Sequence, residues 1–217
     1  MKLGAIAVIT AIVLVACSGS GSSPQPGTAA PTTGAPASAT PDARAGDVAR
    51  AFIEAYGAFD VEQAIAYLAD EADLSEFAGT REGLRLQNAW FDAMGYRQML
   101  GPCEVLATSA SGTTVRCSYD FHSLRSEEIG LGPFGGSYFE ITVSDGAVVR
   151  ASNQLNYADE FSPQVWEPFA KWVSKTYPAD AEVMYTDGSL TDGRLTEESF
   201  RLWKKHSLEY VKAVAQG

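Results

Sequence analysis

The stretch Gly101–Ser123, GPCEVLATSASGTTVRCSYDFHS, decides the fold because two alternating segments flank a Ser/Gly turn within it. Placing Cys103 opposite Cys117 in one register also aligns a charge pair and two further pairs: Glu104 with Arg116, Val105 with Val115, and Ala107 with Thr113. Facing pairs of this kind stabilise antiparallel strands and fix their register. The stretch therefore predicts a β-hairpin with one cysteine on each arm.

A second hairpin is predicted over residues 137–157, after a long loop at residues 124–136. Its turn, Ser144-Asp145-Gly146, suits a three-residue loop with glycine in the left-handed conformation. We expect this turn because a two-residue Asp-Gly turn would place Arg150 opposite Ile141. The longer turn instead places Glu140 opposite Arg150 and Val149 opposite Ile141.

Three helices are expected before the hairpins. Thr40-Pro41 is an N-cap followed by a proline, and Asp60 with Gln63 forms a capping-box arrangement. The third helix is predicted from about Thr80 to Met94, with Gly95 just beyond its end. Helices followed by a meander of strands predict an α+β fold, with the helices packed on one face of the sheet.

This order of elements resembles the nuclear-transport-factor-2-like (NTF2-like, SnoaL-like) superfamily. The resemblance rests on FIEAYGAFDVEQAIAYLAD at residues 52–70, on the third helix, and on hairpins that end at Asn153-Gln154-Leu155. It covers residues 40–158 and implies a curved antiparallel sheet that wraps a helix around a conical pocket. The chain looks most similar to the disulfide-bearing members found in actinobacterial lipoproteins.

Residues 159–217 extend beyond that fold. A helix is predicted to begin at Pro168 and to end at Tyr177-Pro178, and Thr196 caps a final helix. Three of the four tryptophans lie in this region, at positions 166, 172 and 203. We therefore predict a helical extension that packs on the domain and completes its core.

The N-terminus carries export signals. Residues 3–15 form an apolar run that suits a signal peptide and is short for a membrane span. The following Leu14-Val15-Ala16-Cys17 resembles the lipobox of bacterial lipoproteins. The resemblance implies that residues 1–17 are the signal region, and that Cys17 carries diacylglyceryl and palmitate chains as the mature N-terminus. Residues 18–39 contain no charged residue and are expected to form a disordered tether on the extracytoplasmic face of the cell membrane.

Lipidation of Cys17 would leave Cys103 and Cys117 as an even pair in an oxidising compartment, which predicts a disulfide. The formal net charge of −11 argues against a nucleic-acid partner. No cofactor or metal is predicted. Gly130–Gly135 matches G-x-G-x-x-G, but Pro133 removes a backbone amide and a strand follows. The acidic segment 187–198 lacks the glycine that a calcium loop requires at its sixth position.

The strand pattern also predicts a pocket. The face of the predicted strands that points toward the pocket contains no carboxylate or histidine, and it includes Val105 and Ala107. His122 is expected on the opposite, solvated face. The residues predicted to line the pocket are Tyr56, Trp90, Tyr119, Phe121, Asn153 and Tyr157.

Three functions remain open from the sequence. The first is non-catalytic binding of a small apolar ligand, or of a protein partner, at the cell surface. The second is an isomerase, cyclase or dehydratase, with Asp70 or Asp73 as the base and Tyr119 as a hydrogen-bond donor. The third is an interaction domain with a filled cone. The resemblance also implies a homodimer through the outer sheet face, which carries four charged residues: Glu104, Arg116, Glu140 and Arg150.

Overall fold

The computed structural model describes residues 40–186, 188 and 190–216. The predicted signal peptide, lipidation site and tether lie outside these residues. The helices are α1 (Pro41–Gly57), α2 (Val61–Ala66), α3 (Arg81–Ala93), α4 (Glu167–Thr176), α5 (Pro178–Met184) and α6 (Glu197–Gln216). The strands are β1 (Leu68–Asp73), β2 (Arg97–Ser109), β3 (Gly112–His122), β4 (Phe134–Ser144) and β5 (Ala147–Gln154). A short 3₁₀ helix spans Ser126–Ile129 and a π-helical turn spans Ser162–Trp166.

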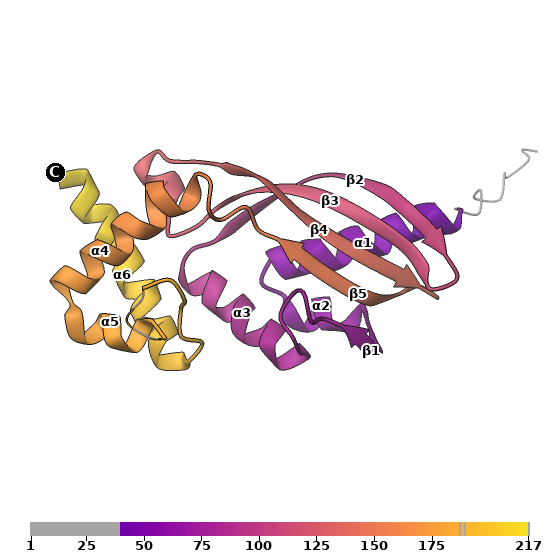
Figure 1. The fold of residues 1–217 in the computed structure, drawn as a ribbon, viewed down its shortest axis with the longest axis horizontal. Helices are drawn as coiled ribbons and strands as arrows, with labels where there is room; N and C mark the ends of the chain where they lie inside the picture. The colour runs from indigo at the N-terminus through magenta and orange to yellow at the C-terminus, as the bar shows by residue number, and fades with distance from the viewer. Residues whose placement is uncertain (1–39, 187, 189, 217) are drawn as a thin grey trace, which may run out of the picture. The chain divides into compact units, whose positions relative to one another are not determined.

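The strands form one curved sheet in the order β1-β5-β4-β3-β2, and α1 lies along one of its faces (Figure 1). Fully buried apolar side chains fill the space between them, including Phe52 and Ile53 from α1 and Phe139 and Ile141 from β4. This arrangement confirms the predicted α+β fold class with helices packed on the sheet. The sheet is not antiparallel throughout, because β1, which we did not predict, pairs with β5 in parallel.

Local capping signals position the N-terminal helices as predicted. The Thr40 hydroxyl accepts a hydrogen bond from the Ala43 amide at the start of α1, and the Asp60 carboxylate accepts one from the Gln63 amide at α2. Gly95 follows α3 with φ of +67°, a conformation that glycine adopts without steric cost. These caps satisfy backbone groups that a helix end leaves unpaired.

The cysteine hairpin has the predicted register around the cysteines. Cys103 pairs with Cys117, and their sulfur atoms form a disulfide of 2.05 Å. The register then shifts, so that Ala107 lies opposite Thr114 and not Thr113. Val105 lies opposite the buried Val115, as predicted, but is exposed because β2 is the edge strand of the sheet. Ala107 is exposed opposite Thr114, so our placement of Ala107 on the inner face is wrong.

The second hairpin differs from the prediction at its turn. Ser144 pairs with Ala147, so the turn has two residues, Asp145 and Gly146, with φ of +52° and +80°. Positive φ at both positions is typical of the type I′ turn, whose twist matches that of the flanking strands. A register shift between Thr142 and Val143 absorbs one residue of β5 and keeps apolar side chains on the inner face.

That shift also changes the charge pairs on the outer face. The Arg116 guanidinium binds the Glu140 carboxylate on the neighbouring strand. Glu140 lies opposite Ser152 on β5, so the predicted pair with Arg150 is wrong. Arg150 instead lies 3.1 Å from the Glu76 carboxylate, which precedes α3.

The C-terminal helices share an aromatic core with α3. Trp203 of α6 is fully buried, and its ring centroid lies 5.4 Å from that of Trp166, 5.6 Å from Phe169 and 5.8 Å from Trp90. One turn further along α6, the His206 ring is buried. Each of its two nitrogens lies 2.8 Å from a carboxylate oxygen; one carboxylate belongs to α5 and the other to α6. Aromatic packing therefore joins the extension to α3, and the polar cluster joins α5 to α6 within the extension.

Candidate functional site

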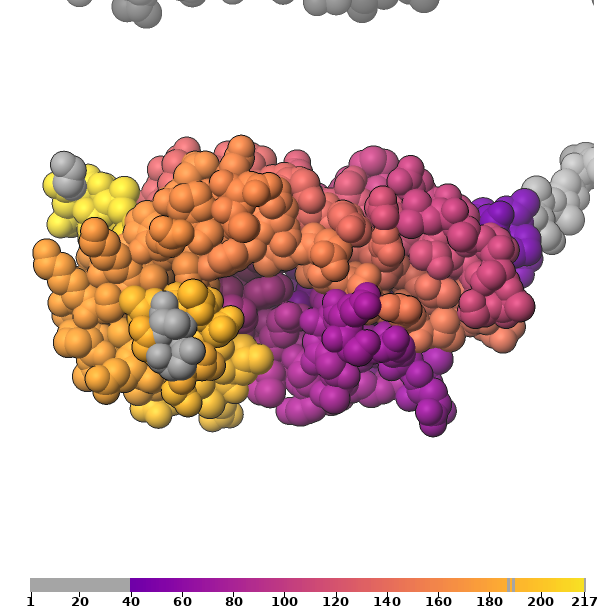
Figure 2. Space-filling view, viewed as in Figure 1, coloured from indigo at the N-terminus to yellow at the C-terminus, as the bar shows by residue number. Residues whose placement is uncertain are grey.

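A pocket of about 250 Å³ opens between α3, the end of β3, the segment after β5 and the C-terminal extension. Figure 2 shows this face of the molecule hollowed where the orange segment after β5 faces the purple residues of the N-terminal half. The lining is mainly aromatic and comprises Gln87, Trp90, Phe91, Met94, Tyr96, Phe121, Ser123, Leu155, Tyr157, Phe161, Trp166, Thr191 and Asp192. It includes three residues that we predicted from the sequence: Trp90, Phe121 and Tyr157.

The pocket walls are held by ring–ring contacts between separate elements. Trp90 of α3 meets Trp166 edge-on, with ring centroids 6.2 Å apart. Tyr157, from the segment after β5, also meets Trp166 edge-on at 5.6 Å. Edge-to-face pairs at these distances are favourable, so the rings fix one another's orientation. The result is an aromatic corner formed by three separate parts of the chain.

Trp90 leaves a polar group without a partner at this corner. Its Nε1–H is buried and has no hydrogen-bond partner among the described residues. Backbone from the loop before α6 packs tightly on the indole, since a Cβ added at Gly193 would lie 2.4 Å from Trp90 Cζ2. Because Nε1 itself is buried, the corner offers a ligand its aromatic rings and not this N–H.

The other three predicted residues lie behind the pocket. Tyr119 and Asn153 are hydrogen-bonded to each other inside the cone, with the Tyr119 hydroxyl donating to Asn153 Oδ1 at 2.7 Å. The Tyr56 hydroxyl donates to Gln87 Oε1 at 2.9 Å. Gln87 lines the pocket, so Tyr56 orients a wall residue from behind. None of these three side chains is part of the pocket lining.

The phenols in this region are held in their neutral form. Burial raises the pKa of Tyr119 to about 12, and burial also raises the pKa values of Tyr56 and Tyr96 well above 10.0. They therefore act as hydrogen-bonding groups near neutral pH and not as proton acceptors. Among the described residues that line the pocket, the carboxylate is that of Asp192, which is exposed.

The carboxylates proposed for the catalytic alternative lie elsewhere. Asp70 and Asp73 are exposed on β1 and absent from the pocket lining. Asp73 accepts a hydrogen bond of 2.7 Å from the Ser75 hydroxyl and lies 3.7 Å from the Arg150 guanidinium. The geometry thus gives neither residue access to a ligand in this pocket.

His122 is buried, contrary to the prediction that it faces solvent. Only 7% of it is exposed, and its Nδ1 lies 3.1 Å from Ser126 Oγ. The loop after β3 folds back over this end of the sheet, with Leu124 and Arg125 both at positive φ. His122 therefore lies at a polar position of the strand pattern but is buried, because this loop covers it in place of water.

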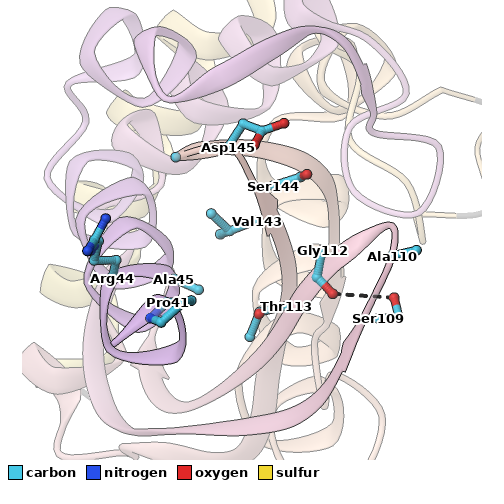
Figure 3. A pocket seen from close by; sticks show the side chains of 11 residues that line it. Pro41, Arg44, Ala45, Ser109, Ala110, Gly112, Thr113, Val143, Ser144 and Asp145 are labelled. Carbon is cyan, nitrogen blue, oxygen red and sulfur yellow. Dashed lines mark hydrogen bonds between the residues drawn. The ribbon is translucent and has the colours of Figure 1, made fainter. Parts of the chain in front are cut away.

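A second hollow of about 450 Å³ lies where α1 begins and both hairpins turn (Figure 3). Arg44 and Pro41 of α1 lie on one side, and turn residues such as Ser109 and Asp145 lie on the other. The Ser109 hydroxyl donates to the Gly112 carbonyl at 3.3 Å. No aromatic side chain lines this hollow among the described residues, so it lacks the aromatic walls common in small-molecule sites.

No family model and no curated protein matches this chain. Among solved structures, a putative polyketide cyclase from Xanthomonas campestris pv. campestris is 24% identical over 54% of this chain and 93% of its own, with a TM-score of 0.40. A putative polyketide cyclase from Pseudomonas putida KT2440 is 19% identical over 53% and 93%, with a TM-score of 0.38. An NTF2-like protein of unknown function from Cytophaga hutchinsonii is 10% identical over 51% and 88%, with a TM-score of 0.36. Similarity this low establishes neither a family nor an activity.

Proposed function

We propose that this chain is an NTF2-like, lipid-anchored extracytoplasmic protein that binds a small apolar ligand in the aromatic pocket without transforming it. The observation that carries this proposal is the pocket whose walls include the aromatic corner of Trp90, Tyr157 and Trp166. A volume of about 250 Å³ lies below the roughly 300 Å³ at which pockets for drug-sized ligands begin. The ligand would therefore be a molecule of one or two rings.

The catalytic alternative is a cyclase or isomerase acting in the same pocket. The cyclase names belong to structural neighbours of low similarity, so the alternative depends on this chain's own residues. A proton-transfer mechanism needs a base within hydrogen-bond reach of the ligand, usually with a pKa tuned by burial. The carboxylate of the lining, Asp192, is exposed, and this favours binding over catalysis.

The lipid anchor is tested separately from the ligand site. None of the helices in the described part of the chain is both long and apolar enough to cross a membrane. Under the proposal, membrane attachment depends on the acyl chains of Cys17, since two or more chains give stable anchoring. Replacing Cys17 by alanine should therefore block lipid attachment, which is measured as loss of labelled palmitate from the protein. A Cys17→Ala protein that still carries the label would overturn this part of the proposal.

The ligand site is tested by filling it. Leu155 lines the pocket and is only partly buried, so a Leu155→Trp substitution would place an indole in the pocket volume. We expect two-ring aromatic compounds such as 2-naphthol to raise the melting temperature of the purified native chain. The same compounds should raise the melting temperature of the Leu155→Trp variant by much less, because the added indole excludes the ligand.

The matched control is Leu106→Trp on edge strand β2, where the side chain is 42% exposed and lies far from the pocket lining. This variant should respond to the ligand like the native chain, which accounts for nonspecific effects of an added tryptophan. Equal responses of Leu155→Trp and Leu106→Trp would contradict binding in this pocket. Native mass spectrometry of the chain as purified would show any ligand that remains bound.

A further inference from the structure

The mouth of the aromatic pocket carries two carboxylates on different elements. Asp192, in the loop before α6, lines the pocket itself. Glu167, the first residue of α4, lines an adjoining groove of about 470 Å³. The pocket and the groove share Tyr157, Trp166 and Thr191, so they are two parts of one continuous lining.

Tyr157 lies at the junction, because it lines both the pocket that contains Asp192 and the groove that contains Glu167. Burial is the main cause that raises the pKa of Tyr157, and the charges of Glu167 and Asp192 raise it further. The hydroxyl oxygen has no partner of normal hydrogen-bond geometry among the described residues. The nearby Ser162 hydroxyl donates instead to Glu167, at 3.3 Å. The phenol oxygen itself is buried, so a positively charged group at this mouth would be attracted by the two carboxylates.

The surrounding groups favour the same ligand chemistry. The rings of Tyr157 and Trp166 lie at the junction and that of Trp90 lies in the inner pocket, and ring faces attract organic cations. The formal net charge of −11 also draws cations toward the surface. The basic residue of the lining is Lys171, one turn after Glu167 on α4, and it lines the outer groove but not the inner pocket.

We propose that the ligand is an organic cation: an apolar ring body that fills the inner pocket, with a protonated amine held at the mouth by the carboxylates of Asp192 and Glu167. This inference rests on the proposed ligand-binding function and names the chemical class of the ligand. An anionic ligand of the same size would meet two like charges at the mouth, where Lys171 is the one basic side chain among the described residues of the lining.

Three probes with one ring system test the inference on the purified native chain by isothermal titration calorimetry. They are 1-naphthylmethylamine, 1-naphthalenemethanol and 1-naphthoate, which are positive, neutral and negative at neutral pH. We expect the amine to bind about tenfold more tightly than the alcohol, the size of one partly desolvated cation–π or ion contact. The naphthoate should bind most weakly, and added salt should reduce the preference for the amine.

Two charge-removing variants locate the effect. Asp192→Asn and Glu167→Gln should each weaken binding of the amine about three- to tenfold and leave binding of the alcohol unchanged. Glu182→Gln, at an exposed position on α5 outside this lining, is the matched control and should change neither. Equal binding of amine and alcohol, or tighter binding of naphthoate, would overturn the cation inference while leaving ligand binding intact. Binding of none of the three probes would overturn both proposals.

Discussion

Replacing Trp203 by alanine is expected to lower the free energy of unfolding by about 3–5 kcal/mol, the usual cost of removing a buried aromatic side chain. Trp203 is fully buried, and its ring contacts those of Trp166, Phe169 and Tyr185 from the extension. It also contacts Trp90 of α3, at 5.8 Å. Its loss would leave a large cavity where the extension meets the N-terminal helices. Urea denaturation of the purified chain, followed by circular dichroism, measures the change.

A second variant on the same helix separates this effect from a change in helix propensity. Leu208 lies on α6 with 38% of its surface exposed, so Leu208→Ala should change the free energy of unfolding by less than about 0.5 kcal/mol. A Trp203→Ala variant no less stable than Leu208→Ala would contradict a shared aromatic core. The Trp203→Ala substitution should also weaken binding of naphthyl ligands, because Trp203 supports Trp90 and Trp166 from behind the pocket.

Removing the disulfide is expected to cost roughly 3 kcal/mol, because it would free a loop closed by cysteines 14 residues apart. The test compares urea midpoints of the native chain, the native chain with a reductant, and a Cys103→Ala/Cys117→Ala variant. The reduced native chain isolates the cross-link, since the double variant also leaves a small cavity where Cys117 was fully buried.

The double variant is the control for the reductant. Its urea midpoint should not change when the reductant is added. Ser118→Ala, an exposed position beside Cys117, should match the native chain in both conditions. If the reductant left the native midpoint unchanged, the disulfide would not contribute to the stability of the sheet.

The sequence was most informative where the controlling interactions are local. Thr40, Asp60 and Gly95 act on backbone groups a few residues away, so their caps could be predicted from spacing alone. The pairing of Cys103 with Cys117 was likewise predictable, because several facing pairs agree on one register across a short turn.

The errors come from irregular and non-local structure. At the second hairpin we assumed a regular ladder, which made a two-residue turn incompatible with an apolar inner face. The register shift between Thr142 and Val143 removes that conflict, and no residue pattern in the sequence indicates such a bulge. Strand β1 was missed because LADEAD has little β-propensity and its partner, β5, lies far along the chain.

The candidate site was predictable only in part for the same reason. Trp90, Phe121 and Tyr157 belong to elements that the sequence placed around a cone, and all three line the pocket. Trp166 and Asp192 come from the extension, whose docking depends on tertiary packing. The concentration of tryptophans in residues 159–217 indicated a core there, but not that this core would form one wall of the pocket.

The parallel pairing of β1 with β5 also sets the order in which the chain can fold. Leu68 lies opposite Val148, so this contact must wait until a long intervening segment has been synthesised and has formed its hairpins. Contacts between distant residues slow folding because the loop between them must close first. We therefore expect the two hairpins to form early and β1 to dock late. A nascent chain that ends before β5 would expose the edge of β4, where a strand of another molecule can pair with it.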